Sequence, residues 1–110
     1  MIEIIVINYL SERMDVPVAA EILEGETYFV TIEKTGSSVK DHIKTATIAV
    51  KSHAPSLHEA AVLNERVKEM MEGIEELDEV SECLLNTDYN FTDTTTKKYR
   101  YQAVYDIVHY

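Results

Sequence analysis

The residues that could perform metal or acid–base chemistry lie around one strand-to-helix junction. His53 and His58 flank Pro55, and Glu59 follows directly. In a His-Glu-x-x-His motif one helical face presents both imidazoles to zinc and the glutamate acts as general base, and this spacing is different. The proline also leaves the relative directions of the two rings undefined. We therefore predict no metal site and interpret these histidines as surface residues at the ends of elements.

The single cysteine and the many carboxylates do not indicate an enzyme. Cys83 lies in an apolar stretch, where we predict an inert buried thiol, because a reactive thiolate needs a nearby base and an activating environment. One cysteine excludes an internal disulfide and suits a reducing cytoplasm. Twenty acidic residues among 110 produce carboxylate pairs by chance. We predict no catalytic residues and no cofactor, since no nucleophile, base and oxyanion-stabilising groups converge.

Aromatic residues near the C-terminus could in principle stack on nucleic-acid bases. They are Tyr89, Phe91, Tyr99 and Tyr101. The formal net charge of −10 opposes this function, because an acidic surface repels the phosphate backbone. We interpret the aromatics as core and interface residues. The acidic surface keeps the protein in solution, and it would also suit the wall of a passage along which DNA slides.

A strand followed directly by a helix, residues 46–73, organises the chain. The strand alternates, with Ala46, Ile48 and Val50 on one face, and it ends at Pro55, which cannot donate a ladder hydrogen bond. Ser56 and Glu59 form a capping box at the start of the helix. The helical apolar stripe continues to Ile74 or Leu77, and an acidic stripe lies on the outer side: Glu65, Glu69, Glu72 and Glu76.

The remaining segments complete an α+β pattern. Residues 2–14 fit a strand by propensity and a helix by periodicity, and we favour the helix. We expect polar loops at Gly36–His42 and Thr92–Lys98. The expected strands are 18–22, 28–34, 46–54, 80–91 and 99–109.

The order α-β-β-β-α-β-β predicts one domain, residues 1–110, of the α+β class. We expect an antiparallel sheet of about five strands packed by two helices. A chain of 110 residues can bury a single core without disulfides or metals. No apolar run approaches the roughly 18 residues of a membrane span, and the N-terminus lacks the basic region of a signal peptide.

Four segments, in order along nearly the whole chain, carry a resemblance to a known family. They are Tyr9–Arg13, Tyr28–Gly36, the run from Lys51 through Pro55 to Val67, and Asn90–Thr94 with Tyr99–Ala103. Together they resemble the tail terminator, or tail completion, proteins of long-tailed phages and prophages.

This resemblance implies a structural role in the virion tail. Such proteins assemble in the host bacterial cytoplasm into hexameric rings of identical subunits. The ring caps the tail tube protein, stops its polymerisation and joins the head connector protein, while DNA passes through without sequence-specific binding. Two alternatives stay open: a head–tail connector completion protein, and a small acidic intracellular binding or regulatory domain that docks through its helix.

The resemblance points to the two polar loops as the contact regions, because they are polar and carry lysines. The final strand is apolar on both faces, which suggests burial against another subunit. The predicted interface residues are Ser37, Ser38, Lys40, Asp41, Thr94, Thr95, Lys97, Lys98 and, in the final strand, Tyr105.

Overall fold

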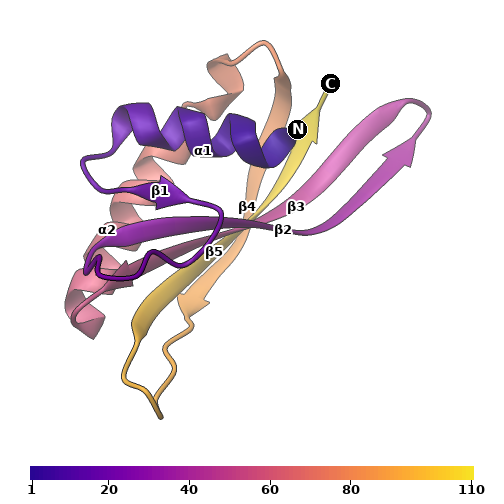
Figure 1. The fold of residues 1–110 in the computed structure, drawn as a ribbon. Coiled ribbons are helices and arrows are strands. Elements are labelled where there is room, and N and C mark those ends of the chain that lie inside the picture. The colour runs from indigo at the N-terminus through magenta and orange to yellow at the C-terminus, as the bar shows by residue number, and fades with distance from the viewer.

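Two helices lie on one face of a five-stranded sheet in the computed structural model, which describes residues 1–110 (Figure 1). The α+β class and the order of the main elements are as predicted. No helix is long and apolar enough to cross a bilayer. The elements are α1 (Ile2–Arg13), β1 (Val18–Ala19), β2 (Phe29–Lys40), β3 (Ile43–Ala54), α2 (Leu57–Met71), the short 3₁₀ helix η1 (Ile74–Glu76), β4 (Val80–Asn90) and β5 (Tyr99–His109).

Strand β3 lies at the centre of the sheet, whose order is β1-β2-β3-β5-β4. It pairs antiparallel with β2 and β5 along nearly its whole length. Its predicted alternation is confirmed: Ile48 and Val50 are fully buried beneath the helices, and Val50 lies between Ile32 and Ala103 of the neighbouring strands. Burial of a side chain of this size contributes roughly 1.5–3 kcal/mol, so this central row anchors the core.

Strand β1 corrects the prediction of a purely antiparallel sheet. It comprises two residues, Val18 and Ala19, in place of the predicted 18–22, and it pairs parallel to β2. The Val30 N–H donates to the Pro17 carbonyl oxygen at 2.9 Å, which closes this short ladder. After Ala19 the chain leaves the sheet as an exposed segment, so the sheet is mixed.

The helices begin as the sequence indicates, but α2 ends earlier than predicted. At its start the Glu59 N–H donates to Ser56 Oγ at 3.2 Å, as expected for the capping residue. The helix stops at Met71, and after Gly73 the chain forms η1, in which Ile74 is still fully buried. Residues 2–13 form a helix, and its buried side chains face the core.

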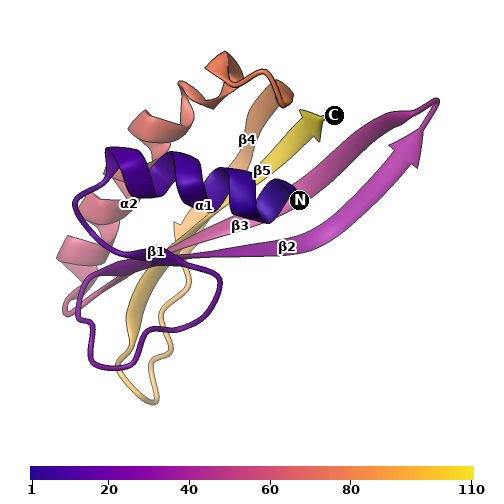
Figure 2. The same ribbon diagram turned by 45° about the horizontal axis from the view of Figure 1, so that its top comes forward.

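The segment predicted as the loop Gly36–His42 is instead the end of a long β-hairpin. Strand β2 continues to Lys40, and β3 begins at Ile43, after a two-residue turn. Asp41 and His42 have φ values of 52° and 66°, the left-handed values that a two-residue hairpin turn requires. The hairpin end, residues 34–45, which we call the arm, projects beyond the helices (Figures 1 and 2). The small Gly and Ser residues suggested a loop, whereas pairing with β3 keeps them extended.

The contact between α1 and the end of α2 generates a stability prediction. The Tyr9 hydroxyl donates to the Met70 carbonyl oxygen at 2.6 Å, and a Cβ added at Gly73 would lie 2.7 Å from that hydroxyl. We expect Gly73→Ala to destabilise the fold by about 1–3 kcal/mol through overcrowding. Tyr9→Phe removes the hydrogen bond and costs about 1 kcal/mol.

Because Tyr9→Phe also removes the obstructing oxygen, the double variant should lose less free energy of unfolding than the sum of the single variants. Urea unfolding of the four proteins measures this coupling. Additive losses would contradict the contact.

Candidate functional site

The residues predicted for contact lie in two separate places. Ser37, Ser38, Lys40 and Asp41 are exposed on the arm. The other group is exposed in the turn between β4 and β5, at a different end of the molecule: Thr94, Thr95, Lys97 and Lys98 (Figure 1). The structure therefore brings together the members of each group, but it does not bring the two groups to one site.

Tyr105 does not belong to either group. Its side chain is buried among the core residues on the helix side of β5, with 4% of its surface exposed, and burial raises the pKa of its hydroxyl. The prediction that Tyr105 contacts another subunit is therefore wrong for this fold. Its alternation along the strand places it under the helices, while Val104 and Val108 face the other side and are half-buried.

The β4–β5 turn is shaped by one carboxylate. Asp93 Oδ1 accepts hydrogen bonds from the Thr95 hydroxyl at 2.6 Å and from the backbone N–H groups of Thr95 and Thr96. These bonds, the Thr95 hydroxyl first, lower the pKa of Asp93 to about 2. The turn therefore has a defined conformation, from which Lys97 and Lys98 extend into solvent.

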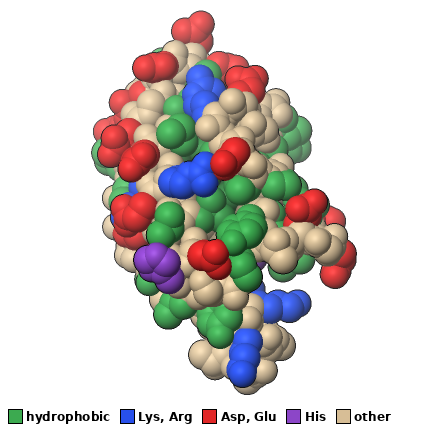
Figure 3. Space-filling view, turned by 90° about the vertical axis from the view of Figure 1, so that its left-hand side faces the viewer, with side chains coloured by type: hydrophobic (Ala, Val, Ile, Leu, Met, Phe, Trp, Pro, Cys, Tyr) green, Lys and Arg blue, Asp and Glu red, His purple; other side chains and the backbone are tan.

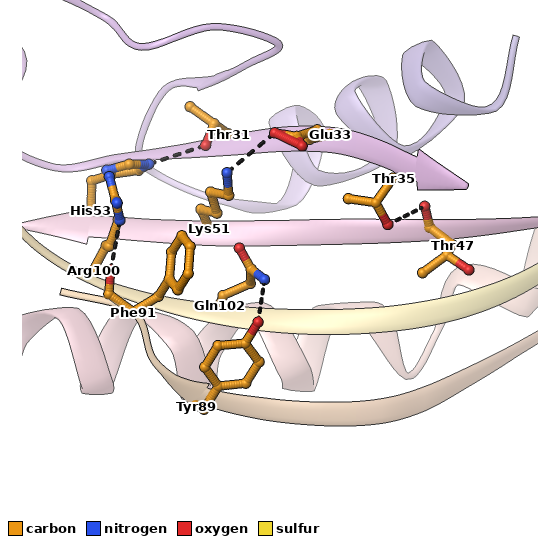
Figure 4. Close-up of polar contacts among 10 residues, drawn as sticks. All are labelled: Thr31, Glu33, Thr35, Thr47, Lys51, His53, Tyr89, Phe91, Arg100 and Gln102. Carbon is orange, nitrogen blue, oxygen red and sulfur yellow. Dashed lines mark hydrogen bonds and ion pairs between the residues drawn. The ribbon is translucent and has the colours of Figure 1, made fainter. Parts of the chain in front are cut away.

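A cationic and aromatic cluster, which the sequence did not predict, lies on the sheet face opposite the helices (Figure 4). Phe91 lies between Lys51 Nζ, 5.5 Å from its ring centroid, and the Arg100 guanidinium, at 4.7 Å. Arg100 Nε donates to the Phe91 carbonyl oxygen at 2.7 Å, and Gln102 Nε2 donates to the Tyr89 hydroxyl at 2.6 Å. These contacts join β3, β5 and β4 across the open face, where Tyr89 and Phe91 stay partly exposed.

His53, predicted as a surface residue, is buried beside this cluster. Its ring stacks on Phe29 with centroids 4.3 Å apart, and Nε2 lies 3.0 Å from the Thr31 hydroxyl. Burial, together with the nearby charges of Arg100 and Lys51, lowers the pKa of His53 to about 4, so the ring is neutral at pH 7. The burial of His53 depends on its position opposite Phe29 in the β2–β3 pair. The sequence alone does not give this pairing, because the register of the two strands must first be known.

A hollow of about 260 Å³ borders this histidine, between residues 22–27 and the β4–β5 turn. Its lining mixes Glu24 and Glu26 with Lys97 and Lys98. No group of three His, Cys, Asp or Glu side chains is placed to hold a metal ion. Cys83, predicted to be buried, is half-buried, and burial raises the pKa of its thiol to about 12, which leaves the thiol protonated at neutral pH.

Charge is strongly segregated over this surface. Residues 69–96 contain nine acidic side chains and no Lys, Arg or His: Glu69, Glu72, Glu75, Glu76, Asp78, Glu79, Glu82, Asp88 and Asp93. The six basic side chains without an ion pair are Lys34, Lys40 and Lys44 on the arm, and Lys97, Lys98 and Arg100 at the β4–β5 turn. Figure 3 shows most of the acidic side chains of one face in its upper part, with some basic side chains among them, and basic side chains at its lower end. Although the net charge is −10, the arm and the β4–β5 turn are therefore two cationic regions of the surface.

Comparison with known proteins leaves the family open. No protein-family model matches the chain, and no curated protein matches it in sequence.

The burial of His53 generates a pH prediction. The unfolded chain binds a proton at this residue below about pH 6.5 and the folded chain only below about pH 4, so stability falls as the pH drops through this window. We expect His53 to account for a loss of up to about 3 kcal/mol between these pH values.

Urea unfolding of the wild type and of His53→Gln at several pH values measures this contribution as the difference between the two pH profiles. His58→Gln, which replaces an exposed histidine of α2, is the matched control. Parallel profiles for the wild type and His53→Gln would contradict a neutral buried ring.

Proposed function

We propose that the protein is a structural subunit that assembles into a ring and caps the tail tube of a long-tailed phage or prophage. The observation that carries the proposal is a sheet with two free, dissimilar edges. Strand β1 pairs only with Val30 and Thr31, so β2 has no outer neighbour along the arm, and β4 is the last strand on the other side. Unpaired strand edges readily pair with another chain.

Two dissimilar edges favour a ring over a symmetric dimer. When one surface of a subunit binds a different surface of the next, the contact repeats in one direction around an axis. Such a head-to-tail assembly closes into a ring when the rotation per subunit divides a full turn. The resemblance to tail terminators through residues such as Lys51–Ser56 supports the same architecture.

The two exposed cationic regions suit the two contacts that a capping ring must make. The arm and the β4–β5 turn project from different ends of the subunit (Figure 1). One region would face the tail tube protein and the other the head connector protein, each through the polar and basic side chains at its tip, which leaves the strand edge of the arm free for a neighbouring subunit. The acidic remainder of the surface would let DNA pass through the ring without binding.

The proposal predicts the effect of losing the protein on tail length. In the phage or prophage that encodes it, deletion of the gene should give tails longer and more variable than the wild type, measured by electron microscopy of lysates. Complementation with Lys97→Glu/Lys98→Glu should restore a folded protein but not tail length, because repulsive charges replace the basic contact surface of the turn. Glu24→Gln, another exposed substitution, is the control and should restore length.

Tails of normal length in the deletion strain would contradict a terminator role. If those tails were also detached from heads, the result would favour the alternative of a connector completion protein.

A further inference from the structure

We propose that the arm edge of β2 in one copy of this chain pairs, antiparallel, with the second half of the β4 edge in the next copy. The inference rests on the proposed ring and specifies its contact. It is supported independently by the free backbone groups, by the charge on each edge and by the geometry of the sheet.

The backbone directions on the arm follow from its turn. Lys40 and Ile43 flank a two-residue turn, so the backbone N–H and C=O groups of these two residues bond to each other. Along β2 the backbone groups of every second residue therefore bond to β3, and those of the residues between them point away from β3. Beyond the irregularity between Lys34 and Gly36, this alternation directs the backbone of Ser37 and Val39 outward. No strand covers these groups.

The β4 edge is covered in its first half and open in its second. The outward N–H of Val80 donates to the Leu77 carbonyl oxygen at 3.0 Å, and that of Cys83 donates to Glu75 Oε1 at 2.8 Å. The same alternation applies to the rest of β4, with one extra residue between Leu85 and Thr87. The backbone N–H and C=O groups of Leu85, Asp88 and Asn90 therefore point away from β5. No strand lies outside these residues, which therefore form the available half of the edge.

The two edges are complementary in charge and both expose apolar side chains. The arm carries three unpaired lysines against one acid, Asp41. Strand β4 carries two acids and no base: Glu82, which has no ion pair, and Asp88, which is paired with Lys68. Val39 of the arm is 68% exposed, and Leu84 of β4 is 56% exposed. Opposite charges across paired strands are favourable, while copies meeting through the same edge would place like charges together.

The geometry of the sheet permits this pairing to close. Strands β2 and β4 run in opposite directions, so copies related by rotation about an axis along the sheet meet antiparallel. Val30 and Asn90 lie at the same level of the sheet, because Val30 pairs with Ser52, Ser52 with Tyr101 and Tyr101 with Asn90. The outward residues Ser37 and Val39 of the arm face Asp88 and Leu85 of the next copy when Lys34 lies opposite Asn90. This register shifts neighbouring copies by four residues along the strands. Along the strands this shift is about 13 Å, and across the sheet the four strands of one copy, β2, β3, β5 and β4, span about 19 Å. The resulting strand tilt of about 35° lies at the edge of the 35–45° range of closed sheets.

A charge swap tests the pairing. Lys40 and Glu82 are exposed, lie in no ion pair and share the sheet face opposite the helices. With Lys34 opposite Asn90, Lys40 falls near Leu84, and Glu82 lies two residues beyond Leu84 on the same face, at the border of the available half of the edge. Diagonal neighbours of this kind on paired strands are within reach of long side chains. We expect Lys40→Glu and Glu82→Lys each to weaken self-association about tenfold or more, measured by sedimentation over a concentration series at low salt. The double variant Lys40→Glu/Glu82→Lys should recover association, because every contact regains an opposite pair. Glu12→Lys, on α1, is the control for the change of charge.

A backbone test avoids charge altogether. Val39→Pro removes one outward N–H, and because that group lies outside the β2–β3 ladder, circular dichroism and thermal unfolding should show an intact fold. Self-association should be lost. Thr94→Pro, in the β4–β5 turn, is the matched control and should associate as the wild type does.

The outcomes separate this inference from the proposed ring. Association of the wild type with no response to Lys40→Glu, Glu82→Lys or Val39→Pro would overturn the edge pairing and leave a ring built through another surface. A wild-type chain that stays monomeric throughout, while deletion of its gene still lengthens tails, would overturn the pairing but not the capping role. Monomers together with tails of normal length in the deletion strain would overturn both.

Discussion

Burial of the central strand β3 between β2, β5 and the helices is the constraint on which the rest of the structure depends. Ile48 and Val50 are fully buried, and Pro55 and Ser56 turn the chain directly from this strand into α2, which covers it. Both helices lie on the same face of the sheet, so the opposite face has no helical cover (Figure 1). The arm edge of β2 and the second half of the β4 edge are left without a neighbouring strand, and unpaired strand edges can pair with another chain.

The face without helices is stabilised by a different chemistry. Stacking of His53 on Phe29 and the contacts of Lys51 and Arg100 with Phe91 cover part of that face with polar and aromatic groups. A neutral histidine is compatible with these neighbouring cations, whereas a charged one would be repelled by them and would lose its hydration. The same contacts fix the start of β5 and hence the direction of the β4–β5 turn.

Segregation of charge connects the fold to the proposed assembly. A chain of net charge −10 would repel its own copies if the charge were uniform. In the proposed assembly, the lysines on the arm would attract the acidic residues between Glu69 and Asp93 of the next copy, and surfaces of like charge would repel each other. In this proposal the local distribution of charge, and not the net charge, would decide which surfaces of two copies meet.

The sequence by itself determined the α+β class and the β3–Pro55–α2 unit, and it favoured the helix at residues 2–13, because periodicity, proline and capping act over a few neighbouring residues. Tertiary structure decided what depends on pairing between distant segments. Gly36–Lys40 became strand through contact with β3, and β1 became parallel through contact with β2. The neutral state of His53 and the buried position of Tyr105 follow from strand register, which local sequence patterns do not encode.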